Sequence, residues 1–142
     1  MAIPNGAGGY QVGDGNLNDP LIDALPEPVS VTTAATLTPA QVLNGLIIAN
    51  SGITAASVTY TLPTVTELEA VLTNSDKTGT SFTFRVVNIG TSSATAIIAA
   101  GTGWTITGSL TMTIPVTTGA TLVARKSSSP GATSAWTLYR VN

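Results

Sequence analysis

Histidine and cysteine are both absent from the 142 residues of this chain. A serine nucleophile usually depends on an imidazole to take its proton, and zinc sites are built mainly from His and Cys ligands. Disulfide bonds and thiolate chemistry are excluded as well. Carboxylate chemistry is the main catalytic option that remains, so we expect a protein that is not an enzyme and that holds no metal or cofactor.

The carboxylates themselves form no catalytic pattern. Glu67 and Glu69 stand two apart in an expected helix and therefore face different directions. Residues 14–25 place oxygen-bearing side chains at alternate positions, as calcium loops do, but Asp19 stands where an EF-hand has glycine and Leu25 where it has glutamate. A turn is the better interpretation of this stretch, because Asx residues and glycine are the usual turn formers.

Charged side chains are scarce throughout the sequence. They make up 8% of the residues, against about 25% in an ordinary globular protein. Intrinsic disorder does not explain the deficit, because disordered chains combine high charge with low hydrophobicity and 43% of this chain is hydrophobic. Threonine, serine, alanine and valine replace the charges, which favours β-structure. A surface with so few charges tends to associate, and we interpret it as a surface that other subunits cover.

The net charge of −2 is too small to indicate binding to nucleic acid or to an anionic membrane. The sequence also lacks a secretory signal pattern and an apolar run near the roughly 20 residues that span a bilayer. We therefore expect a soluble protein that is made in the cytoplasm and whose partners are other proteins.

Residues 1–28 differ from everything after them. Glycine and proline interrupt this stretch so often that neither a helix nor a central strand can run through it. It carries four acids and no base, whereas the remainder has a net charge of +2. Its apolar side chains include Ile3, Tyr10, Val12, Leu17, Leu21 and Ile22. We predict an extended N-terminal arm whose apolar residues contact another subunit; an arm packed on its own domain and a merely acidic tail are the alternatives.

Residues 29–142 have the pattern of one β-domain. Short segments alternate apolar with polar residues or form brief apolar runs, at 29–33, 46–49, 58–62, 82–86, 95–99, 104–107, 110–114, 121–125 and 136–141. Thr38 predicts a single helical turn that ends at Leu43, and Thr64 with Glu67 forms a capping box that starts a longer helix. No period of 20 to 50 residues is repeated, which disfavours a solenoid. The expected fold class is an all-β sandwich with one short helix.

The last expected strand is apolar on both faces near its end, where Trp136, Leu138 and Tyr139 follow one another closely. A strand of this kind is usually central or covered. One interpretation places these three residues in a subunit interface, and the other buries them inside the chain's own sandwich. Trp104 and Trp136 are expected to anchor a core or an interface, because aromatic residues are only 5% of the chain.

Several segments resemble those of small head-decoration proteins of tailed phages. The arm reads MAIPNGAGGYQVGDGNLN at residues 1–18, and the body reads TLPT at 61–64, SFTFRVVN at 81–88, AGTGW at 100–104 and WTLYR at 136–140. The same β-module is also found in head fibres and tail-associated proteins.

The resemblance implies a jelly-roll-like sandwich that forms homotrimers on the outer surface of the capsid of the virion. The implied partners are the major capsid protein and further copies of the chain itself, and the arm would reach over the shell or a neighbouring copy to lock capsomers together. The alternative that the resemblance leaves open is a head-fibre or tail-associated module involved in host attachment.

Overall fold

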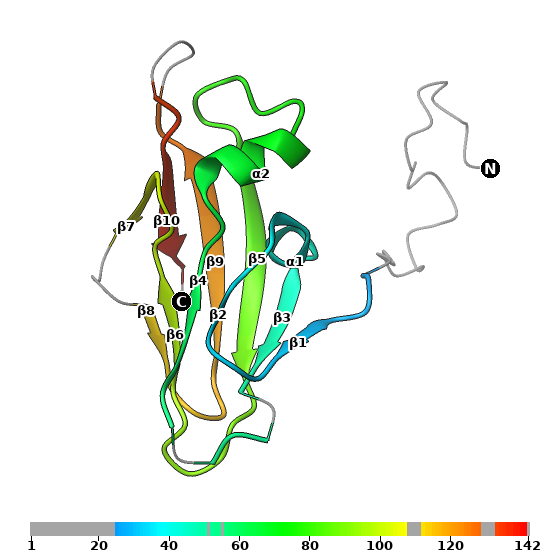
Figure 1. Cartoon of the computed structure of the whole chain (residues 1–142), viewed down its shortest axis with the longest axis vertical. Coiled ribbons are helices and arrows are strands. Elements are labelled where there is room, and N and C mark those ends of the chain that lie inside the picture. Colours follow the sequence, from blue (N-terminus) through cyan, green and yellow to red (C-terminus); the bar gives the residue numbers. More distant parts are fainter. Residues whose placement is uncertain (1–24, 51, 55, 108–111, 129–132, 142) are drawn as a thin grey trace, which may run out of the picture.

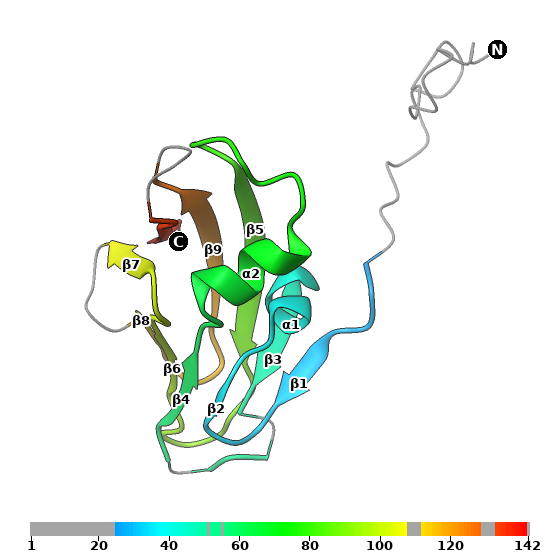
Figure 2. The same cartoon turned by 45° about the horizontal axis from the view of Figure 1, so that its top comes forward.

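Two β-sheets face one another in the computed structural model, which describes residues 25–50, 52–54, 56–107, 112–128 and 133–141. Two short helices lie side by side near one end of the sandwich (Figures 1 and 2). The all-β sandwich expected from the sequence is confirmed at this level.

The larger sheet, sheet A, has six strands in the spatial order β1-β3-β5-β9-β10-β7. Their bounds are Val29–Val31 for β1, Leu46–Ala49 for β3, Ser81–Asn88 for β5, Gly119–Lys126 for β9, Trp136–Arg140 for β10 and Trp104–Thr107 for β7. The central pair is β5 with β9, which run antiparallel over seven paired residues from Ser81↔Arg125 to Val87↔Gly119. These are the two longest described strands, so their register sets the geometry of the sheet.

The smaller sheet, sheet B, has four strands in the order β2-β4-β6-β8. Their bounds are Ala35–Thr36 for β2, Val58–Thr61 for β4, Ala96–Ala99 for β6 and Met112–Ile114 for β8. β2 has only two residues and was not expected from the sequence, because two residues are too few to show an alternation of apolar and polar side chains.

The chain passes back and forth between the sheets. β1, β3 and β5 pair in parallel in sheet A, and β2, β4 and β6 pair in parallel in sheet B. Residues paired between β1 and β3 are 18 apart, as in Val29↔Ile47, whereas those between β3 and β5 are 39 apart, as in Ile47↔Val86. The segments of chain that link successive parallel strands therefore differ in length, so the stacked strands are not accompanied by a sequence repeat.

Both helices begin with a capping box after a strand of sheet B. In α1 (Pro39–Leu43) the Thr38 side chain accepts from the backbone of Gln41, and in α2 (Val65–Val71) Thr64 accepts from Glu67. In return, the side-chain oxygen of Gln41 accepts from the Thr38 backbone N–H, and that of Glu67 accepts from the Thr64 backbone N–H. The sequence prediction of the Thr64–Glu67 box is confirmed.

The core lies between the sheets and under the helices. Alternate residues of the longer strands point inward and are buried, including Phe84 on β5 and Leu122 on β9. Trp104 and Trp136 are both buried, with ring centroids 6.0 Å apart, so the indoles anchor the core. Within the described residues no helix is long and apolar enough to cross a membrane.

A buried hydrogen-bond network links β1 to β4 of sheet B inside this core. The buried Tyr60 hydroxyl accepts from the Asn50 backbone N–H at 3.2 Å, and it lies 2.8 Å from Asn50 Oδ1 and 3.1 Å from the Val31 carbonyl oxygen. Burial raises the pKa of Tyr60, and the hydrogen bond from the Asn50 backbone works in the opposite direction. The phenol therefore stays neutral and can donate to one of the two acceptors.

The capping box of α2 predicts a measurable loss of stability for Thr64→Ala. Because the substitution leaves a backbone N–H of the first turn without its partner, we expect the free energy of unfolding to fall by about 1 kcal/mol. Urea denaturation followed by tryptophan fluorescence measures this. Thr66→Ala is the matched control, since Thr66 is exposed in the same helix. An equal loss for the two variants would contradict the role of the cap.

Candidate functional site

The described residues contain two groups that combine polar and charged side chains. The first is a half-buried network that joins α2 to sheet A, and the second is the outer face of sheet A. Within the described residues, no group of three or more His, Cys, Asp and Glu could hold a metal ion.

Glu69 is the centre of the network between α2 and sheet A. Its Oε1 lies 2.8 Å from Lys126 Nζ and accepts from Trp136 Nε1 at 2.9 Å. Its Oε2 accepts from the Ser134 hydroxyl at 2.6 Å. Lys126 ends β9 with an inward-pointing side chain that is 7% exposed, so the carboxylate neutralises a cation that would otherwise be buried alone.

This network explains the difference between the two helix carboxylates. Burial raises the pKa of Glu69, but the hydrogen bonds from Lys126, Ser134 and Trp136 and the lysine charge outweigh burial and leave the pKa below its ordinary value. Glu67 instead points to the helix start, where hydrogen bonds from Thr64 lower its pKa. Both carboxylates are engaged in holding the fold, and the expectation that they face different directions is confirmed.

The outer face of sheet A carries both apolar side chains and charge. We use this name for the outward residues of β5, β9 and β10, which lie in four rows across paired strands. The rows are Val87 with Gly119, Arg85 with Thr121, Thr83 with Val123 and Tyr139, and Ser81 with Arg125 and Thr137. Apolar and basic rows alternate along the strands, and successive rows are two residues apart because every second residue points outward.

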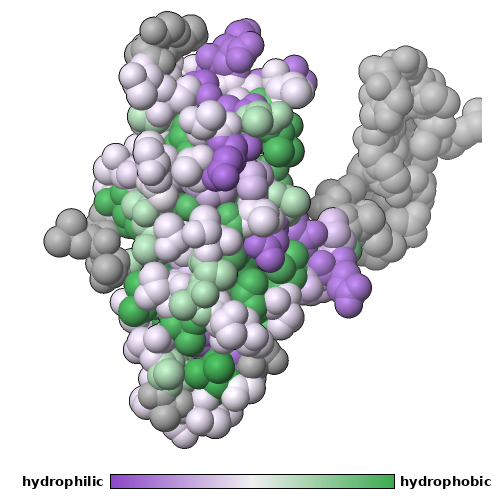
Figure 3. Space-filling model, viewed as in Figure 1, coloured by the Kyte–Doolittle hydropathy of each residue, from purple (hydrophilic) through white to green (hydrophobic). Residues whose placement is uncertain are grey.

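The strands of this face supply no acidic partner to its two arginines. The six strands of sheet A contain no Asp or Glu, and neither Arg85 nor Arg125 forms an ion pair with any described residue. Figure 3 shows the side of the molecule seen in Figure 1, where pale and green areas are interrupted by several hydrophilic patches. Among the described residues, the outer face of sheet A is therefore weakly basic and has the charge to pair with an acidic partner.

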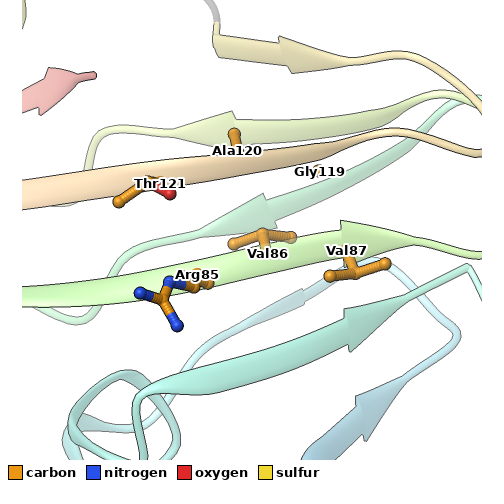
Figure 4. Close-up of a pocket in the computed structure, with 6 residues that line it drawn as sticks. All are labelled: Arg85, Val86, Val87, Gly119, Ala120 and Thr121. Carbon is orange, nitrogen blue, oxygen red and sulfur yellow. The ribbon is translucent and has the colours of Figure 1, made fainter. Parts of the chain in front are cut away.

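A shallow depression of about 190 Å³ lies on this face between the adjacent strands β5 and β9 (Figure 4). Arg85, Val87, Gly119 and Thr121 are among its lining residues. It opens beside Gly119, which has no side chain to fill the row opposite Val87. Its size suits one aliphatic side chain, and the neighbouring guanidinium suits a carboxylate.

The residues proposed for a subunit interface have different places in the structure. Trp136 and Leu138 are completely buried in the chain's own core, which is the alternative that the sequence left open. They are therefore not available on the surface of this chain. Tyr139 keeps 36% of its surface exposed and stands on the outer face of sheet A. The arm residues Ile3, Tyr10, Val12, Leu17, Leu21 and Ile22 lie outside the described residues.

The sequence did not single out Arg85, Arg125 or Lys126 for these roles. The alternation in SFTFRVVN does place Arg85 on the polar side of its strand, which is the signal for an outward arginine. The partner strand and its register, which bring Arg125 to the same face, are not visible in either segment alone.

Comparisons of the chain with family models, with curated proteins and with solved structures give no match.

The network predicts that Glu69→Gln destabilises the protein. The substitution leaves the buried Lys126 ammonium without its counter-charge, and because Glu69 itself is partly exposed we expect a loss near the low end for buried charges, about 2 kcal/mol. Thermal and urea unfolding measure the loss. Asp76→Asn is the control, because this exposed carboxylate should change stability by less than about 0.5 kcal/mol.

The lowered pKa of Glu69 predicts that the protein loses stability in acid. A lowered pKa means that Glu69 contributes stability at pH values above its ordinary pKa of 4.5, and that this contribution is lost as the pH falls through the lowered value. We expect the difference in unfolding free energy between the wild type and the Glu69→Gln variant to shrink as the pH is lowered below 4.5. Urea titrations across this range check it; a difference that is independent of pH would contradict the assignment.

Proposed function

We propose that this chain is a structural capsid decoration, or cement, protein of a tailed phage. It binds the outer surface of the head and stabilises contacts between capsomers through its N-terminal arm and its β-domain. Its partners are the major capsid protein and other copies of itself, and it performs no catalysis. The proposal rests on the resemblance in sequence together with the character of the outer face of sheet A.

That face is the observation that favours a binding role. It combines alternating apolar and basic rows with a depression large enough for one side chain, and the strands that form it carry no acid. The ionisable groups that could serve chemistry, Glu69 and Lys126, are paired with each other and stabilise the fold. A face of this kind suits a protein partner, since interface cores are apolar and arginine is enriched in them.

The finer features of the proposal concern architecture and assembly. We propose that residues 1–28 act as an extended arm and that the protein assembles as a homotrimer at the capsid surface. The comparison with a jelly roll is limited to two facing sheets, because five of the eight described strand pairings are parallel and a jelly roll is built of antiparallel strands. The proposed function therefore depends on the two facing sheets and not on the order or direction of their strands.

Removal of residues 1–24 tests the role of the arm. Capsids that lack the protein are mixed with the wild type or with the shortened chain, and bound copies are counted by quantitative mass spectrometry after sedimentation. We expect the shortened chain to lose most of its occupancy, because contacts along an arm that are repeated by symmetry add avidity. Undiminished occupancy would refute the role of the arm.

The control for this experiment is the fold of the shortened chain. Its circular dichroism and thermal unfolding should match the wild type, because the described core residues all lie at or beyond Val31. If neither version binds any capsid, the proposed function is wrong.

A further inference from the structure

The segment that precedes the described body has a side-chain pattern of its own. From Leu17 to Asp23 every second residue is alternately apolar and acidic, in the order Leu17, Asp19, Leu21 and Asp23. In an extended chain these four side chains point to the same side at intervals of about 6.6 Å. Proline at position 20 favours an extended backbone both at its own position and at Asp19 before it.

The outer face of sheet A has the complementary pattern at the same spacing. Along the β5–β9 pair the rows are apolar at Val87 and Gly119, basic at Arg85, apolar at Val123 and basic at Arg125. Successive rows are two residues apart on each strand and therefore also about 6.6 Å apart. Four apolar or acidic side chains thus match four apolar or basic rows. The two arginines of these rows form no ion pair with a described residue.

We propose that residues 17–23 of a second copy dock along the β5–β9 pair on the outer face of sheet A. Leu17 enters the depression beside Gly119, and Asp19 pairs with Arg85. Leu21 lies on Val123 and Tyr139, and Asp23 pairs with Arg125.

The place where residues 17–23 join the described body favours docking by a second copy over docking on the same chain. The side chain of Leu25 lies against Gly45, 3.7 Å from the position that a β-carbon would have, and Asn44 Nδ2 donates to the Glu27 carbonyl oxygen. From Gly45 to Arg125 is three residues along the strands and two strands across, about 14 Å. Asp23 stands two residues before Leu25, so its backbone extends only about 7 Å from it. This is half of the distance to Arg125, so residues 17–23 of the same chain do not reach the proposed position.

The direction of the described chain agrees with this. In Figures 1 and 2 residues 25–28, which precede β1, lead off the edge of sheet A, not across its face. Going back from β1, the first glycine that would permit a tight reversal is Gly15. A segment from a neighbouring copy meets the face without this tether, so copies would link head to tail through arm and sheet.

This inference goes beyond capsid binding, since the contact needs only two copies of the chain. Its test therefore uses the purified full-length protein alone. The chain has no cysteine, so any disulfide bond reports on cysteines that are introduced.

Disulfide trapping measures the proposed contact directly. One protein carries Leu21→Cys and a second, differently tagged, carries Val123→Cys; both are mixed under mild oxidation and analysed by non-reducing gel and mass spectrometry. We expect the mixed dimer to form about tenfold faster than with Ile22→Cys as the partner, because docking raises the effective concentration and Ile22 faces away. Equal rates for the two partners would overturn the proposal.

The double variant that carries Leu21→Cys and Val123→Cys in one chain distinguishes the two sources of the segment. Disulfide-linked dimers and larger oligomers are expected, since a head-to-tail contact can close into a ring. A disulfide that closes only within one chain would overturn docking by a second copy.

A charge exchange tests the ion pairs. We expect Arg85→Glu with Arg125→Glu, or Asp19→Lys with Asp23→Lys, to weaken self-association about tenfold each in sedimentation experiments, and a mixture of the two variants to restore it. Asp14→Lys is the control, because position 14 is out of phase with positions 17 to 23 and should have little effect. Failure of the mixture to associate would contradict the pairing. Loss of this contact with capsid binding retained would leave the proposed function intact.

Discussion

The register between β5 and β9 is the constraint on which both surfaces of sheet A depend. It places Phe84 beside Leu122 on the inner face and Arg85 beside Thr121 on the outer face. A slip of one residue in either strand would exchange its two faces, turning arginines into the core and phenylalanine into water. The buried Lys126 also depends on this register, because Glu69 is within reach only when the lysine points inward at the end of β9.

Most of the strands could be predicted from the sequence because their signal is local. Leu46–Ala49 and Trp104–Thr107 have the bounds that were expected, and the helix after Thr64 begins where its capping box requires. The pairing of the strands could not be predicted in this way. Whether β3 lies parallel to β5 depends on residues 39 apart in sequence, and nothing within either segment encodes its partner. The unequal lengths of the passages between the sheets also concealed the stacked, coil-like path of the chain.

The candidate site was predictable only in part. Alternation indicates that Arg85 faces outward, but its isolation from acids becomes evident only when all six strands of sheet A are assembled. The sequence likewise left the place of Trp136 open, because a strand with apolar residues on both faces fits a core and an interface equally well. The structure assigns its indole to the core, where Glu69 accepts from it. Lys126 was not foreseen as a buried residue, since its partner is 57 positions away on a helix.

Among the described residues, the strands at the margins of both sheets are short, with three residues in β1, four in β7, two in β2 and three in β8. Short marginal strands give a foreign backbone few hydrogen-bonding groups to extend, which suppresses the fibre-like stacking that a charge-poor, threonine-rich chain would otherwise risk. Association is thereby directed to side chains on the broad faces. Contacts between side chains can be specific and limited to a few copies. The short marginal strands therefore limit the tendency of this charge-poor β-protein to polymerise.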